Sequence, residues 1–319
     1  MADNLCAMPI EVPNREEWFP KLDAFPRPDW PAIQGWKRAW VADEDEIDAM
    51  QQAARHWLGR LRDTLGGAYT VVESEHFHFV SALDETARAR ALQFLEYARE
   101  RLVQILGDVA WTDGKGKHVA LRFTNPDDYY AYISHYYADG RHATSGGVFL
   151  RTGYAHVAYY EKHAMQDERV TLAHELAHNL VAHLPLPAWL NEALAQAFDA
   201  DVGGSRRPLL DRELHAQHEA YWNPETIQQF WMGRSFNHPE GQRVAYSLAR
   251  ILLDIINREV RPPPEVFRRF VKQTILQDAG EAAALEQFEV SLGEIASVFL
   301  GDGDWAPKPS NWDWEAIDS

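Results

Sequence analysis

Two histidines separated by three residues, in His174-Glu175-Leu176-Ala177-His178, constrain this chain more than any other feature. On a helix of about 3.6 residues per turn, His174 and His178 project from nearly the same face, so both imidazoles can bind one metal ion. Glu175 lies about 100° around the helix from His174, where its carboxylate can reach a water at the metal without binding the metal. The pentapeptide therefore predicts a helix that carries a metal site and a general base.

The residues around the pentapeptide favour a buried helix. Leucines recur every four residues through it, and two prolines end it: Leu172, Leu176, Leu180 and Leu184, then Pro185 and Pro187. A second helical segment begins near Trp189 and carries Glu192, fourteen residues after His178, back toward the first. The alternative is a pair of core histidines that other polar groups satisfy. Polar residues on a buried helix need a partner, so we expect a metal site.

These segments resemble the gluzincin branch of the zincin metallopeptidases, and most closely its bacterial peptidase-MA-like families. The resemblance covers residues 69–300 and rests on the order ESEHF, GGVF, HELAH and WLNEALA, followed by a late helical segment at 244–248. It implies Zn²⁺ as the cofactor, held by His174, His178 and Glu192, with Glu175 as the general base. It also implies a zincin-like α+β fold, in which a mixed β-sheet upper lobe lies over the HExxH helix and the lower lobe is mainly helical.

Two departures from that family argue against aminopeptidase activity. Thirteen residues separate His178 from Glu192, fewer than in the thermolysin-like and aminopeptidase-like members. The glycine-rich exopeptidase signature of the aminopeptidases is also missing upstream.

Helical geometry places two further polar residues near the motif. His183 lies about 180° around the helix from His174, so we do not expect it to bind the same ion. Asp199 lies seven residues after Glu192, on nearly the same helical face, where it can orient an imidazole through the ring nitrogen that faces away from the metal. The alternative for Asp199 is a solvated helix end. Cys6, the only cysteine, is far from every motif.

The resemblance implies a zinc-dependent hydrolase, a metallopeptidase whose substrate is a peptide or protein. Glu175 would take the proton of the attacking water. For the residue that stabilises the oxyanion, the resemblance points to Tyr246, with His215, His218 and Tyr221 as weaker candidates; the alternative for Tyr246 is a core aromatic residue. A second hypothesis is a zincin-fold binding or interaction protein whose metal site is structural or vestigial. Glu175 argues against it, because a structural site has no use for a base.

The composition restricts the kinds of molecule that we expect the protein to bind. Hydrophobic residues make up 46% of the 319 positions, enough for a substantial core. The net charge is −17 and basic residues do not cluster with aromatic ones, so we expect neither nucleic acid nor a membrane as partner. Residues 1–20 lack a basic segment followed by an apolar core, and no apolar run approaches about 18 residues, so we expect a cytoplasmic protein. The oligomeric state is left open.

The chain divides into four predicted segments. These are an N-terminal arm and helix (1–66), a zincin-like catalytic lobe with the metal helix and the Glu-bearing helix (67–200), a helical lower lobe (201–300) and an acidic, Trp-rich tail (301–319). We expect the Pro- and Trp-rich residues 1–42 to form little regular structure, with their indole rings docked on the main body. The tail is expected to be docked or loose.

Periodicity predicts the elements within these segments. Helices are expected at 43–65, 84–106, 126–138, 242–258 and 281–299, and strands at 69–72, 76–80, 119–123, 146–150 and 155–160. His76 and His78 share one strand face, where alternation with aromatic residues favours a half-exposed strand over a metal site. The resemblance places residues 146–160 at the edge of the sheet, where an extended substrate could add as another strand.

Overall fold

A computed structural model of the chain describes residues 11–111, 116–137, 146–162, 165–202 and 210–313, so Cys6 lies outside the described residues. The internal contacts divide the chain into two compact units, one comprising residues 1–97 and 112–163 and the other residues 98–111 and 164–319. Helices and a mixed sheet make this an α+β protein. Helix α5 (Met165–Val181), with the histidine pair, and helix α6 (Ala188–Asp201), with Glu192, both belong to the second unit.

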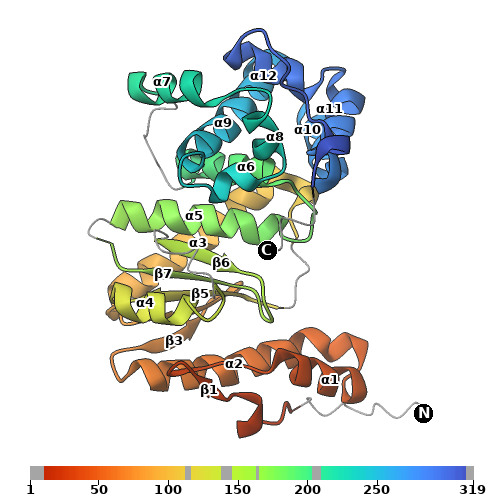
Figure 1. Cartoon of the computed structure of the whole chain (residues 1–319). Helices are drawn as coiled ribbons and strands as arrows, with labels where there is room; N and C mark the ends of the chain where they lie inside the picture. Colours follow the sequence, from red (N-terminus) through yellow and green to blue (C-terminus); the bar gives the residue numbers. More distant parts are fainter. Residues whose placement is uncertain (1–10, 112–115, 138–145, 163–164, 203–209, 314–319) are drawn as a thin grey trace, which may run out of the picture. The chain divides into compact units, whose positions relative to one another are not determined.

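The first unit contains a five-stranded mixed sheet (Figure 1). Its strands are β3 (Thr70–Glu73), β4 (Phe77–Ser81), β5 (His118–Phe123), β6 (Gly147–Leu150) and β7 (His156–Tyr160). Their order is β3-β4-β5-β7-β6, with β4, β5 and β7 parallel and the two outer strands antiparallel to their neighbours. Strand β6 is thus an edge strand, as expected for this part of 146–160, whereas β7 lies inside the sheet and cannot accept an added strand.

The helices and short strands of the first unit come before and between the strands of the sheet. They are η1 (Glu16–Trp18), β1 (Lys21–Leu22), β2 (Phe25–Pro26), α1 (Trp30–Trp40), η2 (Asp43–Asp45), α2 (Glu46–Leu65), α3 (Glu85–Leu106), whose last turns belong to the second unit, and α4 (Pro126–Ile133). The predicted helices at 43–65, 84–106 and 126–138 therefore form, with shifted ends.

Helix α1 corrects the expectation that the N-terminal arm has little regular structure. The Asp29 side chain caps it by accepting a hydrogen bond from Ala32 N at 3.0 Å, and Pro31 stands in its first turn, where no backbone donor is needed. The expected docking of the indole rings is confirmed for Trp30, which is 6% exposed and packs edge-on against Trp57 of α2 at 5.8 Å between ring centroids. It was wrong for Trp40, the last residue of α1, which is 75% exposed.

The interior strand β4 is buried on both faces of the sheet. Val80 and Leu121 lie opposite each other on β4 and β5 and belong to a core that includes Trp57 of α2. Phe79 points to the other face and is also fully buried. The expectation of a half-exposed strand was wrong, because β4 is an interior strand and all five of its residues are buried.

The second unit is helical. Besides α5, α6 and the end of α3 it contains η3 (Gly107–Val109), α7 (Arg212–Tyr221), α8 (Thr226–Trp231), η4 (Arg234–Asn237), α9 (Gln242–Ile255), the π-helical turn η5 (Ile256–Val260), α10 (Pro264–Gln273), η6 (Leu276–Asp278), α11 (Glu281–Phe288), α12 (Leu292–Leu300) and η7 (Pro309–Asn311). One helix was expected at 281–299, but α11 ends where Glu289 turns left-handed at φ +58°. Ser291 and Glu294 then form a capping box that starts α12.

The described part of the C-terminal tail is docked. The side-chain oxygen of Gln228 accepts hydrogen bonds from Lys308 N and from the Trp312 indole, each at 2.9 Å, and its nitrogen donates to the Ala306 carbonyl. Trp231 Nε1 donates to the Trp305 carbonyl at 2.8 Å. Residues 301–313 therefore belong to the packed body of the second unit.

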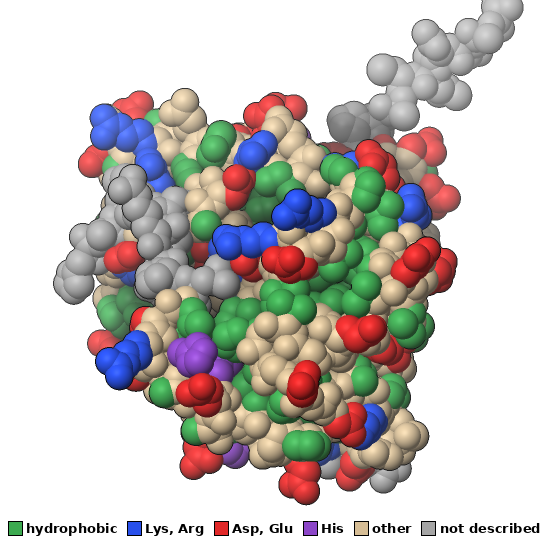
Figure 2. All heavy atoms as spheres, turned by 90° about the horizontal axis from the view of Figure 1, so that it is seen from above, with side chains coloured by type: hydrophobic (Ala, Val, Ile, Leu, Met, Phe, Trp, Pro, Cys, Tyr) green, Lys and Arg blue, Asp and Glu red, His purple; other side chains and the backbone are tan. Residues whose placement is uncertain are grey.

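On the surface shown in Figure 2, acidic, basic and apolar side chains are interspersed, and the basic ones do not gather into a continuous area. Among the described residues, no helix combines the length and apolar character that crossing a bilayer requires.

Candidate metal centre

Helices α5 and α6 pack against each other and supply all three candidate ligands. Leu172, Leu176 and Leu180 bury one side of α5, which ends at Val181, so the leucine stripe stops one turn earlier than the sequence suggests. Pro187 starts α6, whose first turn is anchored by Trp189 through an indole hydrogen bond of 2.9 Å to the Ala279 carbonyl.

The three predicted ligands converge. Nε2 of His174 lies 3.4 Å from Oε2 of Glu192, and Nε2 of His178 lies 3.7 Å from Oε1 of the same carboxylate. One ligand atom from each of the three residues lies within 4.8 Å of the other two. Each side chain keeps between 12% and 20% of its surface exposed, so the cluster is sheltered but reachable from solvent.

The second nitrogen of each imidazole is held by α6. Nδ1 of His174 lies 3.2 Å from Oδ1 of Asp199, and Nδ1 of His178 lies 3.1 Å from Oδ1 of Asn191. Donation from Nδ1–H to these oxygens leaves the lone pair of each Nε2 directed toward Glu192. This is the orientation that metal-binding histidines adopt when a neighbouring acceptor fixes their tautomer.

Asp199 is therefore found where helical geometry suggested. Asn191 was missed, although it directly precedes Glu192. Its only signal in the sequence is its place in the first turn of α6, and its reach to His178 depends on how α5 and α6 cross.

The electrostatics of the cluster favour a positive charge at its centre. Burial lowers the pKa of His174, but contacts with Asp199, Glu192 and Glu175 outweigh burial and hold the pKa of this imidazole well above its usual value. Burial likewise raises the pKa of Glu192, but the two imidazoles outweigh it and lower the pKa of the carboxyl group. A cation shared among these groups would satisfy both tendencies.

The residues fit a zinc ion in two respects. Donor atoms about 2.0–2.2 Å from a tetrahedral zinc lie about 3.4 Å apart, close to the two nitrogen–oxygen separations seen here. Oε2 of Glu192 is buried and has no hydrogen-bond donor within the described part of the chain. Such a buried anionic oxygen without a donor is costly unless a cation binds it. Two imidazoles and one carboxylate are also the donor set of catalytic zinc sites.

No family model and no curated protein sequence matches this chain.

Glu175 is 9% exposed and lies on α5 directly after His174, to whose charge it is electrostatically coupled. Tyr246, predicted to stabilise the oxyanion, lies on α9, which packs against α6. Its carbonyl accepts a hydrogen bond of 2.9 Å from Gln196, one turn after Glu192, and its ring packs edge-on against Phe236 at 5.3 Å.

The weaker candidates for that role are engaged elsewhere. His218 accepts a hydrogen bond from the Trp222 indole at Nδ1 and reaches Ser247 Oγ with Nε2 at 2.9 Å, while burial lowers the pKa of His218 to about 4. His215 faces Glu219 on the surface. The Tyr221 hydroxyl packs against Gly241, where an added Cβ would lie only 2.3 Å from it.

The remaining histidines that could have bound the metal do not join the cluster. His183 is exposed and its ring lies 5.9 Å from that of Trp111, as expected for a residue on the far side of the helix. His76 contacts Glu96 at 2.8 Å, whereas His78 is buried near Glu73. Within the described residues, only His174, His178 and Glu192 form a group of three potential ligands.

Proposed function

We propose that this protein is a zinc-dependent hydrolase of the gluzincin type, which uses water to cleave an amide bond in a peptide or protein. The observation that carries the proposal is the convergence of His174 and His178 on the Glu192 carboxylate, with the outer ring nitrogens held by Asp199 and Asn191. Preorganised ligands of this kind suit a site that must keep its geometry while a substrate enters and leaves.

His174, His178 and Glu192 would hold the metal. When bound, Zn²⁺ acts as a Lewis acid and makes water a stronger nucleophile at neutral pH. Glu175, next to the ligands on α5, accepts the proton of the attacking water and returns it to the leaving amine. Its sheltered position beside the imidazoles fits a base that must not bind the metal itself.

We assign Tyr246 the role of stabilising the oxyanion that forms on the scissile carbonyl. Gln196 links the Tyr246 carbonyl to the turn that follows Glu192, which supports a position of this segment of α9 beside the metal helix pair. A phenol donor there would stabilise negative charge that is larger in the transition state than in the substrate.

A metal with only a structural role would need a closed ligand set. Structural zinc sites have four protein ligands, whereas the described residues supply three at this cluster. A fourth position open to water, together with a carboxylate at Glu175, favours the hydrolase over the binding-protein alternative. The acidic net charge of −17 and the absence of a continuous basic area on the surface in Figure 2 favour a protein or peptide substrate over nucleic acid.

The proposal is tested by separating metal binding from catalysis. Glu175→Gln removes the base and spares every ligand, so zinc content per chain should stay near that of the wild type while amide hydrolysis falls by about 10²–10⁴-fold. Zinc is measured by mass spectrometry of the purified protein, and hydrolysis by cleavage of a denatured cell proteome. Glu168→Gln, two turns earlier on α5, is the matched control and should keep both.

Ligand variants complete the test. His174→Ala and His178→Ala should lose zinc and activity together, whereas His183→Ala, outside the cluster, should lose neither. A Glu175→Gln protein that cleaves as well as the wild type, or a wild type that binds zinc and produces no new peptide termini in the proteome, would refute the hydrolase.

A further inference from the structure

The first turn of α6 is anchored by α8. Trp189, three residues before Glu192, is fully buried, and its ring packs edge-on against that of Trp231 in α8 at 5.9 Å between ring centroids. The turn after α8 also reaches α6, because a Cβ added at Gly233 would stand 3.1 Å from the Cβ of Ala188. The position of α8 therefore sets the position of the turn from which the metal-binding face of α6 starts.

Helix α8 is held in turn by residues 305–312, which we call the C-terminal strap. Trp231 is fully buried, and its indole N–H donates to the Trp305 carbonyl at 2.8 Å. A buried indole N–H needs an acceptor. Undocking of the strap removes this acceptor and opens the polar edge of the indole to water, so the ring is free to move away from Trp189.

Gln228, three residues before Trp231, makes the main polar contacts with the strap. Its Oε1 accepts hydrogen bonds from Lys308 N and from the Trp312 indole, and its Nε2 donates to the Ala306 carbonyl, each at 2.9 Å. One side chain on α8 thus makes three hydrogen bonds to the strap. Its replacement loosens the strap without changing any residue of the metal centre.

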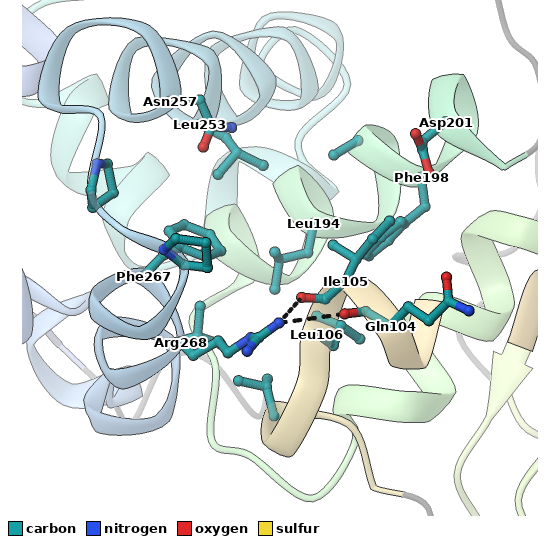
Figure 3. A pocket seen from close by; sticks show the side chains of 15 residues that line it. Gln104, Ile105, Leu106, Leu194, Phe198, Asp201, Leu253, Asn257, Phe267 and Arg268 are labelled. Atoms are coloured by element: carbon teal, nitrogen blue, oxygen red, sulfur yellow. Dashed lines mark hydrogen bonds between the residues drawn. The ribbon is translucent and has the colours of Figure 1, made fainter. Parts of the chain in front are cut away.

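Helix α6 has room to move when its anchor is released. A cavity of about 460 Å³ adjoins its middle turns, where Leu194 and Phe198 line it (Figure 3). Close packing normally prevents a helix from shifting without displacing its neighbours, and a cavity removes that resistance on one side. Both residues lie on the side of α6 roughly opposite Glu192, so a shift into the cavity carries Glu192 away from the histidines of α5.

We propose that docking of the C-terminal strap on α8 raises the affinity of the candidate metal centre for zinc, and that zinc in turn strengthens the docking. The inference rests on the proposed function in taking zinc as the ion. The coupling runs through Trp231 and Trp189 to Asn191 and Glu192. A coupling free energy between two sites is reciprocal, so the strap and the ion change each other's binding by the same factor. We expect a factor of about ten, within the usual range for coupled sites.

The first measurement is the zinc affinity of the full chain, by competition with a coloured chelator. Gln228→Leu keeps a side chain of similar size but removes the three hydrogen bonds to the strap, so zinc affinity should fall about tenfold. Gln229→Leu is the matched control, because that neighbouring side chain has no hydrogen bond to another described residue. Equal zinc affinities of the two variants would overturn the proposal.

The second measurement uses the wild type, so it gives an answer even if Gln228→Leu fails to fold. Hydrogen exchange of the Lys308 amide, which is bonded to Gln228, should slow about tenfold on saturation with zinc. The Glu289 amide, bonded to the Leu285 carbonyl at the end of α11, is the reference and should not change. Exchange at Lys308 that ignores zinc, or equal slowing at Glu289, would overturn the proposal.

The two measurements also separate this proposal from the proposed function. If the wild type binds no zinc, the hydrolase and the coupling fail together. If it binds zinc and either overturning result is found, the coupling fails alone.

Discussion

Nδ1 of His174 lies 3.2 Å from Oδ1 of Asp199, a residue twenty-five positions later on the neighbouring helix. The contact decides which nitrogen of His174 faces Glu192. Nδ1–H donates a hydrogen bond to the Asp199 carboxylate, so the lone pair that can bind a metal is on Nε2. The imidazole is thus oriented when the protein folds, and metal binding does not have to fix it.

Replacing Asp199 should therefore weaken metal binding without removing a ligand. Asp199→Ala is expected to lower zinc affinity about 10–100-fold, and Asp199→Asn, which keeps an acceptor oxygen, should lower it less. Affinity is measured by competition with a coloured chelator. Asp201→Asn, on the opposite face of α6, serves as the control. Wild-type zinc affinity in Asp199→Ala would show that the contact does not orient the ligand.

Asn191 should behave in the same way toward His178, whose Nδ1 lies 3.1 Å from Oδ1 of Asn191. Asn191→Ala removes the acceptor, and we expect about a tenfold loss of zinc affinity in the same competition assay. Asn191→Asp retains an acceptor and adds negative charge next to the cation, so its zinc affinity should equal or exceed that of the wild type. An aspartate variant as weak as the alanine variant would contradict this role.

His78 should make the stability of the first unit sensitive to acid. Its side chain is fully buried, neither ring nitrogen has a hydrogen-bond partner among the described residues, and burial lowers the pKa of His78 to about 4. Between the unfolded pKa of about 6.5 and the folded pKa, the unfolded chain binds the extra proton. The free energy of unfolding is therefore complete above pH 6.5 and falls as the pH drops toward 4, by up to about 3 kcal/mol for this one group.

The measurement is urea unfolding at a series of pH values in a chelator, comparing the wild type with His78→Leu. Leucine cannot bind a proton, so unfolding of the variant takes up about one proton fewer than unfolding of the wild type. Its unfolding free energy should therefore fall less steeply between pH 6.5 and 4. Comparison within one pair of proteins cancels the titration of every other group. Parallel curves for the two proteins would disprove the assignment to His78.

Gly153 should tolerate no side chain. It has φ +75°, and a Cβ there would stand 1.7 Å from Cδ1 of Trp30. Gly153→Ala must therefore strain the backbone and displace an indole that docks the N-terminal arm, and we expect it to lower the free energy of unfolding by about 3 kcal/mol. Gly67→Ala is the control, because no atom lies within 4 Å of its added Cβ. Equal denaturation midpoints for the two variants would contradict the prediction.

Local sequence was sufficient for most helices and strands, because their periodicity and their end signals act over a few residues. It failed where distant contacts decide. Strand β4 alternates like a half-exposed strand, yet it is wholly buried because β3 and β5 pair with its two edges and the side chains on both of its faces are covered. Helix α1 was missed because Trp30 and Pro31, in its first turn, are typical of irregular structure. The cap that starts it is the Asp29 side chain.

The same division applies to the candidate metal site. The spacing of His174 and His178 determines by itself that both imidazoles leave one face of a helix, since the helical repeat depends only on local backbone geometry. The packing of α5 against α6 sets the distance from Glu192 to that pair. It also brings Asp199 to His174 and Asn191 to His178. Helix packing depends on side chains from many parts of the chain, so only the tertiary structure decides which atoms meet.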